Sequence, residues 1–297
     1  MVEVKEVADK VFWFEPAIPG ESNVFSSYLI REEEGVLVEP GPSALVPGIQ
    51  EAMRQLGMKN LAYIIPTHIH VDHAGGAGRL AELFPEAKVV VHPKGVKHMA
   101  DPSRLIESTK TVFGDNFQDV FGPVLPVPES QLVVPEDGET ISVSGRELQI
   151  VYAPGHAPHH IVVFDRKTRG LFCGEALGLP GQGEEPVPLP AVAPPSFDQE
   201  LCLETMEMLG KLDARLLFYS HGGVGTEPER LISVASESTR VLGDLILKSL
   251  KEGEATDAIG RRVMEFASSR YGLKLKEGDA VMTVGGYAIY FQSKGLI

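Results

Sequence analysis

Three histidines and an aspartate lie within six consecutive positions of the stretch PTHIHVDHAGG, residues 66–76. In an extended chain His68 and His70 point to the same side, because strand side chains repeat every two residues. Asp72 and His73 fall where the chain turns into a pair of glycines, so they can face a point beside the first pair. One tetrahedral zinc rarely takes four ligands from so short a stretch. The spacing therefore indicates two adjoining metal positions.

Three more potential metal ligands occur later in the chain, and each follows an apolar run and stands beside a glycine. They are His156 in APGHAPHH, Glu175 in LFCGEALG and His221 in LLFYSHGG. Donors placed directly after strands are what a site at the edge of a sheet requires. Five histidines, one aspartate and one glutamate suit two borderline divalent ions that share a bridging carboxylate and a bridging hydroxide.

The order of these motifs resembles the metallo-β-lactamase superfamily over roughly residues 10–225. Members of that superfamily carry H-x-H-x-D-H, then P-G-H, then glycine with an acidic residue, then a late histidine at a strand end. The resemblance implies an α/β fold, a four-layer αββα sandwich of two mixed sheets. It also implies a ligand set: His68, His70 and His156 for one metal, Asp72, His73 and His221 for the second, and Glu175 as the bridge.

Glu175 departs from the superfamily pattern, which normally has aspartate at the bridging position. The extra methylene moves the carboxylate about one bond length farther from the backbone. Three alternatives stay open: the carboxylate bridges from a receding backbone, binds one metal only, or swings away. His160 corresponds to a second histidine often found after P-G-H, and is expected to pack beside the site rather than bind metal.

The expected chemistry is hydrolysis of an ester, thioester, lactone or related bond in a small metabolite. A divalent ion lowers the pKa of its bound water toward ~7, which makes hydroxide available at neutral pH. Asp72 is the expected catalytic residue, as a ligand and as a proton carrier after attack. Zinc is expected first, with iron or manganese as alternatives.

Two other functions compete with hydrolysis. The first is an iron oxidoreductase of the dioxygenase kind, mononuclear or dinuclear, on the same fold. Flavin-linked diiron relatives generally carry glutamate where His70 stands, which disfavours that branch. The second is a binding protein with a decayed site, which the retention of the other ligands disfavours.

Short apolar runs alternating with helical segments must position these ligands. Val11–Phe14, Val24–Ile30, Gly35–Glu39 and Leu61–Ile65 are predicted as strands, and the last is apolar enough to be buried on both faces. Further strands are predicted at 88–92, 140–143, 147–153, 160–165, 170–173 and 215–220. Helices are predicted at 47–57, 78–84, 94–100, 101–111 and from about Ser196, with Gln199 completing a capping box, to Gly210.

Two stretches rich in glycine and proline are expected to be irregular: 113–130 and 178–195. The second directly follows Glu175, so it either lines the pocket or is a solvated connector. Helical periodicity then dominates at 227–251, 255–271 and 279–293. We therefore predict a catalytic domain at 1–225 and a C-terminal helical appendage at 226–297. Tyr287 and Tyr290 on the last helix reach substrate, pack in the core or form dimer contacts.

Composition narrows the expected partners and location. The chain has 297 residues, with 27 basic and 41 acidic side chains and a formal charge of −14. Such a field repels phosphate backbones and anionic lipids, so no nucleic acid and no membrane partner is expected. Two cysteines form no disulfide framework, and no signal peptide or spanning segment is recognised, which favours a cytoplasmic location. A homodimer is left open.

Overall fold

The computed structural model describes residues 2–18, 24–181 and 187–297. Its contacts divide the chain into two compact units. The first comprises Met1–Tyr152, His159–Gly174 and Ala214–Val224, and the second comprises Ala153–Pro158, Glu175–Asp213 and Gly225–Ile297. The last segment of the second unit begins at Gly225, one residue before the predicted appendage, but the division into domains 1–225 and 226–297 stays a prediction.

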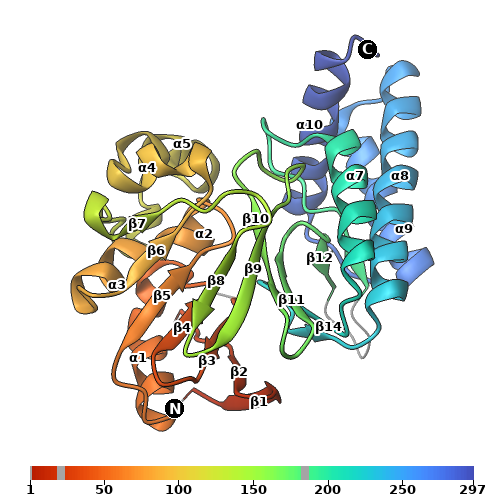
Figure 1. The fold of residues 1–297 in the computed structure, drawn as a ribbon. Coiled ribbons are helices and arrows are strands. Elements are labelled where there is room, and N and C mark those ends of the chain that lie inside the picture. The colour runs from red at the N-terminus through yellow and green to blue at the C-terminus, as the bar shows by residue number, and fades with distance from the viewer. Residues whose placement is uncertain (1, 19–23, 182–186) are drawn as a thin grey trace. The chain divides into compact units, whose positions relative to one another are not determined.

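The first unit contains a seven-stranded mixed sheet in the order β1-β2-β3-β4-β5-β6-β7 (Figure 1). The strands β1 to β4 pair antiparallel, and β4 to β7 pair parallel. Their bounds are β1 Val4–Ala8, β2 Val11–Phe14, β3 Ser27–Ile30, β4 Gly35–Val38, β5 Leu61–Ile65, β6 Lys88–Val90 and β7 Leu132–Val133. Since β4 and β5 are parallel, their carboxyl ends meet at one edge of this sheet.

A second mixed sheet has the strand order β15-β14-β11-β10-β9-β8. Its strands are β8 Thr140–Val143, β9 Arg146–Tyr152, β10 Ile161–Asp165, β11 Gly170–Gly174, β14 Leu216–Tyr219 and β15 Val224–Gly225. The strands β8 to β11 pair antiparallel, whereas β11 and β14 are parallel. Two mixed sheets, followed by C-terminal helices, are the α/β architecture that the sequence predicted.

Alternating side chains of the first sheet supply two cores. In β4, Val36 and Val38 pack in a cluster with Ile150 and Phe172 of the second sheet, whereas Leu37 packs in a cluster with the helices. This alternation follows from the two-residue period of a strand. The helices of this unit are α1 Val46–Gln55, α2 Val71–Ala74, α3 Ala77–Leu83, α4 Val96–Ala100, α5 Ser103–Phe113 and α6 Phe117–Phe121. The short 3₁₀ helices are η1 Ser43–Leu45, η2 Pro93–Gly95 and η3 Glu129–Gln131.

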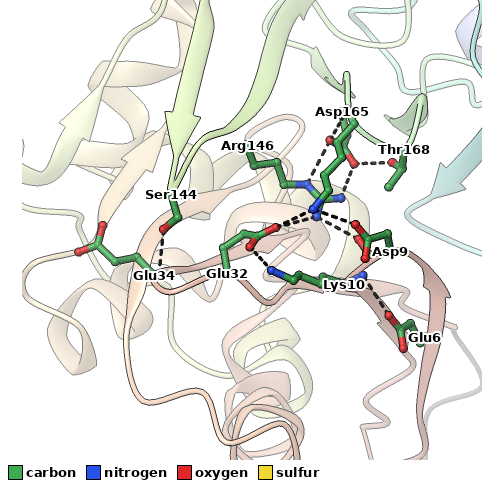
Figure 2. Close-up of polar contacts among 10 residues, drawn as sticks. Glu6, Asp9, Lys10, Glu32, Glu34, Ser144, Arg146, Asp165 and Thr168 are labelled. Atoms are coloured by element: carbon green, nitrogen blue, oxygen red, sulfur yellow. Dashed lines mark hydrogen bonds and ion pairs between the residues drawn. The ribbon is translucent and has the colours of Figure 1, made fainter.

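A buried ion network joins turns of the two sheets (Figure 2). Arg146, at the start of β9, donates to both oxygens of Asp165 at 3.1 and 2.5 Å and to Glu32 at 3.2 Å. Thr168 also donates to Asp165, and Lys10 pairs with Glu32 at 2.6 Å. The arginine and aspartate side chains are only 1% and 0% exposed. Their contacts connect the β3–β4 turn of one sheet to the β8–β9 and β10–β11 turns of the other.

The second unit is mainly helical. Its helices are α7 Gln199–Leu209, η4 Gly210–Leu212, α8 Pro228–Lys251, α9 Thr256–Tyr271 and α10 Glu277–Ser293. On α10, Tyr287 is fully buried, donates its hydroxyl to Thr239 O at 2.8 Å and packs on Phe197, and Tyr290 is buried as well. Of the three alternatives for these tyrosines, packing in the core is the one that the structure shows.

Several local predictions are corrected. The stretch 113–130 contains α6 and η3, and 178–195 contains the antiparallel pair β12 Leu179–Pro180 and β13 Pro188–Leu189, while residues 182–186 lie outside the described part. The capping box is wrong, because the residue that caps α7 is Asp198, whose side chain accepts from Leu201 N at 3.1 Å. Within the described residues, no helix combines the length and apolarity needed to cross a membrane.

Candidate metal centre

The first candidate ligands follow the end of β5. Residues 66–70 continue from Ile65 without regular structure, and α2 begins at Val71, so Asp72 and His73 lie in its first turn. The side chains of His68 and His70 meet, with 2.8 Å between Nε2 of the first and Nδ1 of the second. Thr67 Oγ1 lies 3.1 Å from His68 Nδ1. The extended spacing thus brings the pair together as predicted.

Asp72, His73 and His221 form a second group in the same unit. One ligand atom from each lies within 4.8 Å of the others. The Oδ2 atom of Asp72 is 3.4 Å from His73 Nε2 and 3.8 Å from His221 Nε2. Residues that are 148 positions apart in the chain therefore converge, because β14 carries His221 to the site. Two imidazole nitrogens and a carboxylate oxygen are ligands that zinc, iron and manganese all accept.

Glu39 is a site residue that the sequence analysis missed. It follows the last residue of β4, is 4% exposed and has a positive φ of 59°. One carboxylate oxygen accepts from the backbone N–H of Thr67 at 2.7 Å, and the other contacts Nδ1 of His73. This contact directs the Nδ1 proton to the carboxylate and leaves Nε2 to face Asp72. The sequence signal was an acidic residue directly before Pro40-Gly41, at the end of a parallel strand.

A backbone carbonyl orients His221 in the same way. Its Nδ1 atom lies 2.6 Å from the carbonyl oxygen of Val24, which can only accept. Nδ1 must therefore donate a proton to this carbonyl, and Nε2 is the ring nitrogen that faces Asp72. The ring of Phe25 packs against the imidazole at a centroid distance of 5.7 Å.

His156 and Glu175 lie in the second unit and contact each other. His156 Nε2 is 2.8 Å from Glu175 Oε2, and its Nδ1 is 2.9 Å from Ala191 O. Both side chains are at least nine-tenths buried. The turn before His156 requires glycine, because Gly155 has φ +135° and a Cβ there would meet Cys202 N at 2.5 Å. Glycine beside the donor was therefore an informative sequence feature.

Two neighbouring side chains pack rather than offer ligands. The ring of His160 is fully buried and stacks on His68 at a centroid distance of 4.8 Å, as expected of a packing group. Cys173 donates to Phe218 O at 3.4 Å, and burial raises its pKa well above the usual range. That thiol stays protonated inside the strand, where the sequence placed it.

Each predicted ligand thus belongs to a polar cluster within its own unit: His68 with His70, Asp72 with His73 and His221, and His156 with Glu175. The donor chemistry fits a divalent ion, since three imidazoles engage Nδ1 with Glu39, Val24 O or Ala191 O and turn Nε2 toward a carboxylate of their own cluster. That is the arrangement typical of metal-binding histidines. Assembly of all seven residues into one site stays a prediction.

A comparison with protein families identifies the family to which this chain belongs. The sequence model described as "Metallo-beta-lactamase superfamily" matches residues 21–221, more than half of the chain. The chain belongs to the metallo-β-lactamase superfamily. Membership confirms the family that the motif order had indicated, and with it the sandwich of two mixed sheets.

Curated members of the superfamily are similar over part of their length. The metallo-beta-lactamase fold-containing protein ST1585 of Sulfurisphaera tokodaii is 28% identical over 170 residues, which cover 56% of this chain and 62% of that protein. A hydroxyacylglutathione hydrolase of Synechococcus sp. is 26% identical over 156 residues, 52% of this chain and 50% of the enzyme. The chain therefore spans about half to two thirds of these relatives.

Solved structures show the same fold over more of the chain. The ST1585 structure has a TM-score of 0.64 and 25% identity, and covers 78% of this chain and 85% of that one. The metallo-beta-lactamase family protein TTHA1429 of Thermus thermophilus has a TM-score of 0.72, covers 96% of this chain and 94% of that one, and is 18% identical. At that identity the second likeness establishes the fold alone.

Proposed function

We propose that the protein is a metal-dependent hydrolase that cleaves an ester, thioester or lactone bond of a small molecule. The observation that carries the proposal is the convergence of Asp72 Oδ2, His73 Nε2 and His221 Nε2 within 4.8 Å. Each imidazole there is oriented by a separate acceptor, Glu39 or Val24 O. Such preorganisation costs free energy and is typical of a site that holds a cation.

The ligand assignment follows the superfamily order. His68, His70 and His156 would hold one divalent ion, and Asp72, His73 and His221 the second. Glu175 would supply a carboxylate, either as a bridge or to one ion only. Two divalent ions, with zinc expected first, would lower the pKa of a water molecule and polarise the carbonyl oxygen of the substrate.

The side chains of the protein would orient the reaction and move the proton. Asp72 has Oδ2 directed toward both histidines of its group, and its side chain is 24% exposed, so it can also face solvent and substrate. A carboxylate in that position can accept a proton after attack and pass it to the leaving group. We therefore propose Asp72 as both ligand and catalytic residue.

Thioesters are the first substrate class to test, because relatives named hydroxyacylglutathione hydrolase match about half of the chain. The two free cysteines are both buried, which is compatible with the proposed cytoplasmic location but does not require it. A small-molecule substrate, without nucleic acid or membrane, remains our proposal for the partner. The homodimer alternative stays open.

Elemental analysis and a substrate panel test the proposal together. Protein purified without added metal should hold about two divalent ions per chain, and a chelator should abolish hydrolysis until zinc or manganese is restored. Asp72→Asn should lose most of the activity, whereas Asp119→Asn, which changes an exposed carboxylate of α6, should not. A protein that holds its metals but hydrolyses no ester, thioester, lactone or phosphodiester would contradict the proposal, and iron with dioxygen consumption would favour the oxidoreductase alternative.

A further inference from the structure

We infer that residues 24–28, Val-Phe-Ser-Ser-Tyr, form a positioning segment that fixes His221 for metal binding, with the Tyr28 hydroxyl as its main anchor. The segment leads into and begins β3, which lies in the first sheet, whereas His221 follows β14 of the second. The inference rests on the proposed function, since it takes His221 to be a metal ligand.

Alternate residues of the segment bind the loop that carries His221. Val24 O accepts from the imidazole Nδ1 at 2.6 Å. Ser26 N donates to Ser220 O at 2.8 Å, and Ser26 Oγ accepts from Gly223 N at 3.1 Å. The segment thus contacts the loop through two backbone groups and the Ser26 hydroxyl, while the ring of Phe25, between them, packs on the imidazole.

The Tyr28 hydroxyl holds both sides of this loop. Its proton is shared between Tyr219 O at 2.6 Å and Gly223 O at 2.9 Å, the carbonyls two residues before and two after His221. Tyr219 N also donates to Gly223 O at 3.0 Å and closes the loop. Tyr28 is fully buried, and burial raises its pKa well above the usual range, so the hydroxyl remains a donor.

The ring and the hydroxyl of Tyr28 have separable roles. The ring packs on Phe172 and Phe218 at centroid distances of 5.3 and 5.2 Å, so it contributes to the core between the sheets. The hydroxyl contributes the two bonds to the loop carbonyls given above. Phenylalanine at this position would keep the packing and release the loop. The imidazole would then lose a fixed position relative to Asp72 and His73, and the ion held by those three residues would bind more weakly.

Calorimetric titration of zinc into metal-free protein tests this inference. Tyr28→Phe should weaken one of the two binding steps by about tenfold and leave the other unchanged, as loss of a group that orients a ligand typically does. Ser26→Ala should act in the same direction. The matched control is Tyr287→Phe, which also removes a buried tyrosine hydroxyl that donates to a carbonyl, Thr239 O at 2.8 Å, but leaves the loop of His221 intact.

The outcomes separate this inference from the proposed function. If Tyr28→Phe and Ser26→Ala bind both ions as the unmodified protein does, the positioning role is overturned while the hydrolase proposal stands. An equal loss in both steps, matched by Tyr287→Phe, would also overturn it, because that result reports general stability. If the unmodified protein binds no metal, the proposed function fails first. If Tyr28→Phe does not fold, the zinc affinity of Ser26→Ala tests the positioning role instead, because this variant removes one hydroxyl that bonds to the same loop.

Discussion

The carboxylate of Glu39 contacts Nδ1 of His73, so an acidic side chain from the end of one strand orients a histidine that follows the next. The same carboxylate accepts from Thr67 N at 2.7 Å, directly before His68. A single buried group therefore fixes both the imidazole and the backbone from which the ligand motif starts. Loss of either contact would leave a buried donor unsatisfied.

Glu39→Gln tests this double role. Glu39 accepts two hydrogen bonds, but an amide has one acceptor oxygen and a nitrogen that can only donate. The variant must lose the bond from Thr67 N or force the proton of His73 onto Nε2, where it blocks metal binding. We expect the affinity of one metal-binding step to fall about tenfold or more, measured by calorimetry.

Glu51→Gln serves as the control for Glu39→Gln, because that carboxylate is partly exposed on α1 and bonds only to Arg54 and Gln55 among the contacts described. It should leave both metal-binding steps unchanged. Unaltered zinc affinity in Glu39→Gln itself would show that His73 needs no acidic neighbour.

The network around Arg146 predicts a large effect on stability. Arg146→Ala leaves Asp165 buried without its cationic partner, and removing one member of a buried ion pair typically costs about 3–5 kcal/mol. The free energy of unfolding in urea should fall by that amount. Arg166→Ala is the matched control, since its pair with Glu147 spans 3.8 Å between half-exposed side chains and should cost less than about 1 kcal/mol. If both variants lose a similar free energy of unfolding, burial of the Arg146–Asp165 pair does not explain its contribution to stability.

Sequence reasoning located strands well where apolar runs are bounded by turn residues. The predicted strands 61–65 and 140–143 have the bounds observed for β5 and β8, because both pack in cores that leave little freedom of register. It missed β1, a strand at the edge of the sheet in which two of the five residues, VKEVA, are charged and exposed. Edge strands need little burial, so hydrophobicity does not mark them.

Candidate ligands could be proposed from the sequence, but the groups that orient them could not. Histidines and acids at strand ends could be recognised from spacing alone. Their orienting partners are backbone carbonyls such as Val24 O and Ala191 O, which every residue possesses and no motif reveals. Glu39 was recognisable in type, but only the parallel pairing of β4 with β5 brings it to His73.

The start of α7 allows a test of which residue caps the helix, the observed Asp198 or the predicted Ser196. Asp198→Ala should lower the free energy of unfolding by about 1 kcal/mol, because Leu201 N loses its acceptor. Ser196→Ala, at the position that the sequence pattern had suggested, should have no measurable effect. Asp198 also lies 3.5 Å from Lys294, which pairs with Glu200 at 2.5 Å, so Lys294→Met measures the joint share of these two ion pairs. A cost for Ser196→Ala equal to that of Asp198→Ala would contradict the observed cap.

Glu175→Asp tests whether the longer carboxylate is an adaptation of this chain. In the structure Glu175 reaches His156, a proposed ligand of the first ion, at 2.8 Å, whereas Asp72, His73 and His221 converge without it. Aspartate restores the residue usual in the superfamily and withdraws the carboxylate by about one bond length. We expect the second ion to bind at least as tightly as in the unmodified protein, measured by calorimetry with zinc. Weaker binding of that ion would show that the pocket is built around glutamate, and that the departure from aspartate is part of its function.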